Sequence, residues 1–162
     1  LLSEKNADLL TGHKVLSMAE LRSRCEIMLE NYTKTVSIEA LTMIDMARKQ
    51  ILPAVESYAA KLAETLATKK ALSPLLGGKY ETRLLPTLSG LTDDIAEAAD
   101  ALEASLAAYH TIPHDTEAPC YIRDQGRPKM DALRAPPDEA ERFTAAEYWP
   151  FPTYGDLLFG VK

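Results

Sequence analysis

The sequence is short of several features that would point to a common function. It has only two cysteines, Cys25 and Cys120, in 162 residues, which is too few for a disulfide framework, so we expect reduced thiols. Its net charge of −6 leaves no basic excess to meet nucleic-acid phosphates. No apolar run approaches the roughly 20 residues that a membrane-spanning helix needs. No signal peptide is visible. We therefore expect a cytoplasmic protein that binds neither nucleic acid nor membrane.

The residues that are present have the composition of helices. Hydrophobic residues make up 46% of the chain and charged residues 26%, both ordinary for a globular protein. No stretch alternates with period two over the length of a strand, so we predict no sheet. The prediction is an all-α fold, an antiparallel bundle of three long helices with shorter N-terminal helices and an aromatic C-terminal tail. Residues 1–162 form one domain, divided into N-terminal helices (1–36), the long-helix bundle (37–143) and the aromatic docking tail (144–162).

Two patterns predict the N-terminal helices. Residues 3–10 have the pattern of a short helix that the following glycine stops. The stretch Ser17-Met18-Ala19-Glu20 is a capping box, in which the N-cap side chain and the third helical residue satisfy each other's backbone amides. This box opens a helix through about residue 32. Thr35 or Ser37 then caps, or merely interrupts, the next helix.

The long helices are predicted from apolar positions at coiled-coil spacing. One helix runs to about residue 72, and Pro53 should kink it near Lys49. After a glycine-containing loop, the next runs from about 79 to 109. In both helices the apolar positions follow alternating steps of three and four. They are Leu52, Val55, Ala59, Leu62 and Leu66 in the first helix, and Leu88, Leu91, Ile95, Ala98 and Leu102 in the second.

The rest of the bundle is predicted from charge and from proline positions. Residues 88–109 carry five acidic side chains and no basic one, whereas the helix before them is rich in Lys and Arg. Two neighbouring helices with complementary edges explain this pattern, although each exposed pair contributes little in water. A last long helix begins near Glu117 or Cys120. Pro136-Pro137 should end it, with a short helical turn over 138–143 after that.

Residues with catalytic or metal-binding chemistry do not form a convincing site. His110, His114, Asp115 and Cys120 fall within eleven residues, but Pro113 breaks the helix that would align them, so solvated loop histidines are the simpler interpretation. The acidic pairs Asp93 with Asp94 and Glu139 with Glu141 fit a solvated face better than a pocket. Cys25 has no partner at a suitable spacing and reads as a small buried thiol. We predict no catalytic, cofactor-binding or metal-binding residue in this chain.

The strongest functional signal is the C-terminal tail. Six of the 11 aromatic residues lie between Phe143 and Phe159, including the only tryptophan. Aromatic residues at this density anchor either the protein's own core or a partner surface, and both interpretations remain open at this point. Thr153 is a plausible N-cap for one final helical turn over 154–159. The predicted interface residues are Trp149, Phe151, Tyr154, Leu157, Leu158 and Phe159.

The tail also carries a resemblance to a known family. Residues 148–159, YWPFPTYGDLLF, closely resemble the C-terminal signature of the type III glutamine synthetases, the long bacterial form of that enzyme. A second match is Ile38 to Val55, IEALTMIDMARKQILPAV, and a weaker third combines residues 3–6 with the region of Tyr32. The matches run from near the first residue to near the last. The chain also begins without methionine, which suggests a piece of a longer protein.

The resemblance implies a parent enzyme that joins ammonia to glutamate with ATP and a divalent metal, Mg or Mn, as stacked hexameric rings in the cytoplasm. None of the family's catalytic residues matches a position here, so this fragment alone is predicted to be inactive and to have no cofactor of its own. We expect a structural or regulatory C-terminal helical domain. Its expected partners are the catalytic domain of the same enzyme and neighbouring subunits of a homo-oligomer. The alternative is a free-standing helical interaction module with no enzymatic role.

Overall fold

The computed structural model describes residues 2–112, 117–152 and 154–160, and the regular structure of these residues is entirely helical. The all-α class predicted from the sequence is therefore confirmed. Two of the elements, labelled η, are single π-helical turns inside longer helical runs. In chain order the elements are α1 (Glu4–Gly12), α2 (Met18–Met46), η1 (Ala47–Ile51), α3 (Leu52–Leu72), α4 (Lys79–Tyr109), α5 (Glu117–Tyr121), η2 (Ile122–Gly126), α6 (Arg127–Phe143) and α7 (Tyr154–Phe159).

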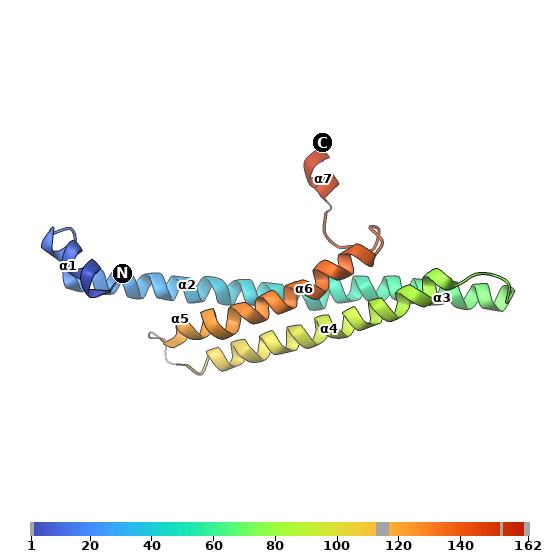
Figure 1. The fold of residues 1–162 in the computed structure, drawn as a ribbon, viewed down its shortest axis with the longest axis horizontal. Helices are drawn as coiled ribbons and strands as arrows, with labels where there is room; N and C mark the ends of the chain where they lie inside the picture. Colours follow the sequence, from blue (N-terminus) through green and yellow to red (C-terminus); the bar gives the residue numbers. More distant parts are fainter. Residues whose placement is uncertain (1, 113–116, 153, 161–162) are drawn as a thin grey trace.

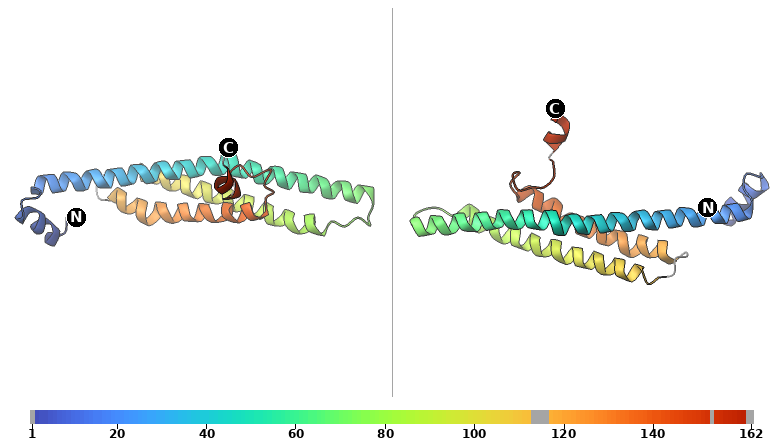
Figure 2. Two further views of the ribbon diagram at one scale, coloured as in Figure 1. Left: turned by 90° about the horizontal axis from the view of Figure 1, so that it is seen from above. Right: turned by 180° about the vertical axis from the view of Figure 1, so that it is seen from behind.

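The helices assemble into an elongated rod (Figure 1). The run α2–η1–α3 continues without a break along the whole length of the rod, and α4 runs back beside it after the turn at residues 73–78. The run α5–η2–α6 then packs along α4. Helix α1 lies at one end of the rod, and α7 stands away from its side (Figures 1 and 2).

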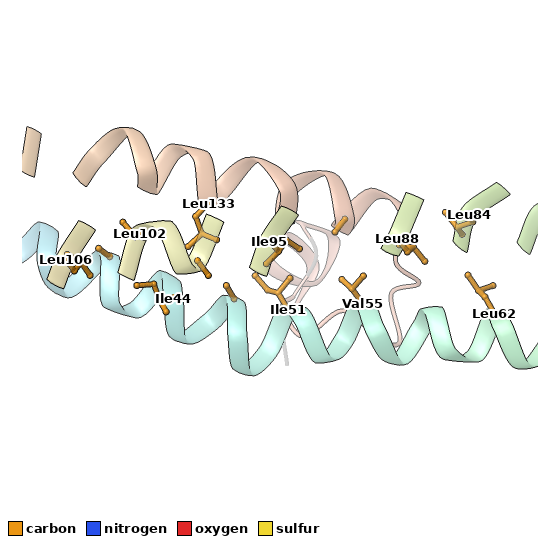
Figure 3. Packing of buried hydrophobic residues seen from close by; sticks show 14 residues of the cluster. Ile44, Ile51, Val55, Leu62, Leu84, Leu88, Ile95, Leu102, Leu106 and Leu133 are labelled. Carbon is orange, nitrogen blue, oxygen red and sulfur yellow. The ribbon is translucent and has the colours of Figure 1, made fainter. Parts of the chain in front are cut away.

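A continuous apolar core joins the long helices, and Figure 3 shows its side chains between them. The predicted seams are confirmed, because Val55 and Leu62 of α3 and Leu88, Ile95 and Leu102 of α4 are all buried. Full burial of one such side chain contributes about 1.5–3 kcal/mol. The predicted capping box is also present, since the Glu20 amide donates to Ser17 Oγ and the Ser17 amide donates to the Glu20 carboxylate.

A proline follows each of the two π turns, two residues after the turn ends. At η1 the amide of Leu52 donates to the carbonyl of Ala47, and Pro53 follows. At η2 the amide of Arg127 donates to the carbonyl of Ile122, and Pro128 follows. Proline has no amide hydrogen and its ring crowds the carbonyl four residues earlier, so a wider turn relieves that contact. The disturbance predicted near Lys49 therefore takes the form of a π turn.

The predicted interruption at Thr35 or Ser37 is wrong, because α2 runs through both positions to Met46. Thr and Ser weaken helices when their side chains offer the backbone other hydrogen bonds. Here Thr33 Oγ1 donates to the carbonyl of Glu30 within the same helix at 2.9 Å. Val36 and Ala40 are buried on the inward face of α2, and this packing holds the helix through the hydroxyl-rich stretch.

The predicted end of the last long helix at Pro136-Pro137 is also wrong, because α6 continues to Phe143. The two prolines remove two amide donors, which would normally end a helix. Tertiary packing compensates for this loss, since Leu133, Pro137 and Ala140 lie at steps of four and three and are all buried. The expected separate turn over 138–143 is thus the last part of α6.

Candidate interaction surface

The aromatic segment begins with a compact turn after α6. Thr144 ends the helix and is buried, and its Oγ1 donates to the carbonyl of Ala140 at 2.8 Å. The amides of Tyr148 and Trp149 both donate to the carbonyl of Ala145, at 2.9 and 3.3 Å. These bonds turn the chain back toward the bundle. The first part of the predicted docking tail is therefore anchored to the rod.

An aromatic cluster covers this turn. The rings of Tyr58 and Tyr148 lie 5.4 Å apart, and those of Trp149 and Phe151 lie 6.1 Å apart in an edge-on arrangement. Trp149 and Phe151 are half-buried and pack against the main core. The hydroxyls of Tyr58 and Tyr80 form a hydrogen bond at 3.1 Å. This bond is the main cause, and partial burial the second cause, that raises the pKa of Tyr58 to about 12. The cluster thus ties α3, α4 and the start of the tail together.

The end of the tail behaves differently. Helix α7 begins at Tyr154. It projects away from the rod, as Figure 1 and the right-hand view of Figure 2 show. Leu157, Leu158 and Phe159 are 67%, 69% and 82% exposed. Groups of exposed large apolar side chains are common at protein interaction sites. Thr153, the predicted cap of this helix, lies outside the described residues.

The structure places five of the six predicted interface residues in two groups, and the side chain of the sixth, Tyr154, lies outside the described part of the chain. Trp149 and Phe151 pack on the rod, whereas Leu157, Leu158 and Phe159 face solvent. Pro150 and Pro152 lie on either side of Phe151 and are exposed. Their fixed φ angles restrict the backbone on both sides of Phe151.

Two charged contacts hold α4 against the preceding helices. Arg48 Nη2 lies 2.6 Å from Asp100 Oδ1 and 2.7 Å from Glu103 Oε2, which realises part of the predicted complementary edges. The hydrogen bond from Arg48 lowers the pKa of Glu103 below its ordinary value. Near the turn between α3 and α4, Lys69 pairs with the buried Glu81 and lowers the pKa of that carboxyl.

Residues weighed for catalytic or metal chemistry are dispersed. Cys25 is half-buried on α2, and His110 and Cys120 are exposed at two helix ends, while His114 and Asp115 lie outside the described residues. Across the described part of the chain, no three His, Cys, Asp or Glu side chains are grouped as metal ligands. In the same part, no helix is long and apolar enough to cross a membrane.

One surface escaped the sequence reasoning. Ile27, Met28, Ile38 and Leu41 of α2 are 53%, 64%, 64% and 54% exposed. Beside them lies an open groove of about 850 Å³, between α2 and the facing ends of α4 and α5. The signal was present in the sequence, because α2 carries apolar residues on two faces rather than one.

The fold and these surfaces define an elongated helical domain that presents apolar side chains on its rod and on a projecting terminal helix. Comparison with known proteins then gives the family. The sequence model of the glutamine synthetase C-terminal domain matches residues 1–70. The chain is 31% identical over 161 residues to a glutamine synthetase of Butyrivibrio fibrisolvens, a match that covers 99% of this chain and 23% of the relative.

Further relatives agree with this assignment. The chain is 26% identical to a type-3 glutamine synthetase of Dictyostelium discoideum, over 97% of this chain and 22% of the relative. It is 31% identical to a glutamine synthetase of Bacteroides fragilis (strain YCH46), over 93% of this chain and 21% of the relative. The chain thus spans less than a quarter of the length of these relatives. It corresponds to a C-terminal domain of glutamine synthetase.

Proposed function

We propose that this domain is a structural or regulatory appendage of a type III glutamine synthetase, and that α7 docks it onto the catalytic part of the enzyme. The observation that carries this proposal is the exposure of Leu157, Leu158 and Phe159 on a helix that leaves the rod. The rod acts as an antiparallel bundle of three helical runs, and the aromatic cluster fixes the point from which α7 projects. The docked surface belongs to the same subunit or to a neighbouring one.

The parent reaction in this proposal is the ATP-dependent ligation of ammonia to glutamate in the cytoplasm, in a homo-oligomer. The family implies ATP and Mg or Mn for that reaction. The described residues of this chain do not fit a metal site, because they supply no cluster of three suitable ligands. We therefore assign ATP and metal to the catalytic part of the longer enzyme, and derive no chemical step for this domain.

The test uses the full-length enzyme that carries this domain. Leu157→Ser with Phe159→Ser should weaken ring assembly, measured by sedimentation velocity, and lower glutamine formation. The matched control is Leu72→Ser with Leu75→Ser, which removes two exposed leucines at the far end of the rod. If assembly and turnover are unchanged in the α7 variant, the docking proposal is wrong.

The rival function, a free-standing interaction module, has one observation in its favour. Trp149 and Phe151 pack on the domain's own core, as a self-contained tail would. Hydrogen exchange of the isolated chain separates the two ideas. Docking on another part of the enzyme predicts slow amide exchange over residues 145–149 and fast exchange throughout α7, whereas a self-contained tail predicts protection of both.

Deleting the whole domain gives an independent test of its role. A full-length enzyme truncated just before Leu1 that fails to assemble would show that the domain holds the rings together. Normal assembly with altered response to effectors would favour a regulatory role. Normal assembly, turnover and regulation together would contradict both.

A further inference from the structure

The face of α2 that points away from the bundle core carries several exposed apolar side chains. Figure 2 shows, in its view from behind, that the run α2–η1–α3 passes along this side of the rod, and no other helix of the described residues lies in front of it. The large apolar side chains on this face are Ile27, Met28, Ile38 and Leu41, each more than half exposed. Single exposed apolar residues are normal on a protein surface, but four of them on one helix suggest a contact with another molecule.

The face has the spacing of a second helical seam. Starting at Glu20, exposed residues recur in alternating steps of four and three as far as Asp45, which is the spacing by which one helix packs along another. Charged side chains occupy both ends of this stripe. Its middle consists of apolar and amide side chains together with one charged residue, Lys34. The stripe consists of Glu20, Arg24, Ile27, Asn31, Lys34, Ile38, Leu41 and Asp45.

We propose that this stripe is an interface for a second copy of the same chain, with the two α2 helices antiparallel about a two-fold axis near Lys34. Symmetry of this kind places the same surface on both partners. It brings Arg24 of each copy to the Asp45 end of the other, and the Ile27 end of each stripe onto the Ile38–Leu41 end of the other.

Charge complementarity selects this arrangement. An antiparallel pair also brings Glu20 toward Lys49 of the second copy. Within each copy Lys49 already pairs with Asp45, so Arg24 and Glu20 of the second copy extend this pair into a group of two acidic and two basic side chains at each end of the stripe. A parallel pair would place Arg24 on Arg24 and Asp45 on Asp45, which is unfavourable. Near the axis, each Lys34 already pairs with Glu30 of its own helix, which offsets the repulsion between the two lysines.

The size and shape of the surface agree with a helix as the occupant. From Arg24 to Asp45 the stripe extends over roughly 31 Å of helix, about six turns. Lys34 and Ile38 also border the groove beside α2, whose opposite side includes Tyr109 and Pro119. A second helix lying on the stripe therefore has a recess along part of its length. This surface is separate from α7, so the proposal does not depend on α7 docking.

The test is a charge exchange in the full 162-residue chain, in a background with Leu157→Ser and Phe159→Ser so that α7 cannot drive association. Sedimentation velocity should show a dimer for this background. Arg24→Glu and Asp45→Arg should each weaken dimerisation at least about tenfold, because each places like charges together at both ends. An equimolar mixture of the two variants should recover the dimer, since the mixed pair has opposite charges at both ends.

The matched control is Arg22→Glu, an exposed arginine that lies off the stripe. It should leave the dimer unchanged, and circular dichroism should show equal helix content in all variants. A background chain that stays monomeric at its highest soluble concentration would overturn the proposal. So would single variants that dimerise normally, or a mixture that does not recover.

Discussion

Among single residues, Glu81 has the most demanding environment, because it is a buried carboxylate near the start of α4. Its partner is Lys69 near the end of α3, which is only partly exposed. Burial disfavours the charged carboxylate, but the hydrogen bond from Lys69 outweighs burial and lowers the pKa of Glu81. Removing either partner of such a pair leaves the other without its compensating charge. The pair thus fixes how α3 and α4 meet at their turn.

This pair predicts a specific dependence of stability on acid. The folded pKa of Glu81 lies below its ordinary value, so its contribution is present above the unfolded pKa and is lost as pH falls through the folded pKa. Glu81→Gln should be less stable than the native sequence near pH 7, and the difference should shrink toward about pH 3. Urea unfolding over this pH range measures both proteins.

Glu97→Gln, an exposed carboxylate on the same helix, is the control and should show little difference at any pH. Other carboxylates with lowered pKa values, such as Glu103, are shared by all three proteins and cancel in the comparison. A constant gap between Glu81→Gln and the native sequence across the range would contradict the role assigned to the ion pair.

A second residue-level prediction concerns the core. Ile95 is fully buried where α4 faces the helical runs on either side of it (Figure 3). Ile95→Ala should lower the free energy of unfolding by about 2–5 kcal/mol, through lost transfer energy and the cavity left behind. Leu72→Ala, at an exposed position near the end of α3, should change it by less than about 0.5 kcal/mol. Similar losses in the two variants, measured by urea unfolding, would mean that the core lies elsewhere.

Whole helices were predictable where local pattern and tertiary packing agree. Helix α4 begins at Lys79, directly after Gly77 and Gly78, and ends at Tyr109, as its seam and the preceding glycine-containing loop indicated. The two errors arose where packing overrides local preference. The hydroxyl-rich stretch around Thr35 stays helical because α2 is packed on its inward side, and α6 continues through Pro136-Pro137 because Leu133 and Ala140 are buried. Both effects come from contacts with other helices, and the local sequence does not reveal these contacts.

The first turn of α2 gives a prediction at the scale of an element. Ser17→Ala removes the N-cap of the capping box, a change that typically costs about 1 kcal/mol of helix stability. The exposed residues Met18, Ala19 and Glu20 make up this turn, so we expect local fraying rather than global unfolding. Hydrogen exchange should become faster over this turn and remain unchanged in α4. Ser23→Ala, an exposed serine inside α2, is the control. Faster exchange throughout the rod would show that the cap supports the whole bundle.

For the molecule as a whole, the tail consists of two parts with different roles. The sequence predicted an aromatic interface but could not show which aromatic residues would pack on the domain's own core. That depends on tertiary contacts, such as those of Tyr58 with Tyr148 and with Tyr80. The outward stripe on α2 was missed for the related reason that two amphipathic faces on one helix look like ordinary helix composition.

Two truncations test this division. A chain ending after Pro152 lacks α7 and should keep the native unfolding midpoint, since the exposed residues of α7 add little to the core. A chain ending after Glu147 also loses Trp149 and Phe151, which pack on the main core, and should unfold at a lower temperature. Thermal unfolding followed by circular dichroism compares them. Equal midpoints for the two truncated chains would show that the aromatic cluster does not support the rod.

The position of Trp149 has a practical consequence. It is the only tryptophan of the chain, and it is half-buried at the joint between the rod and the projecting helix, 6.1 Å from the ring of Phe151. Its fluorescence therefore reports on one joint rather than on the protein at large. A change in emission while the far-ultraviolet signal of the helices stays constant would record movement of the tail against an intact rod. The fluorescence of Trp149 in the native chain can therefore report the binding of a partner to α7 without an added label.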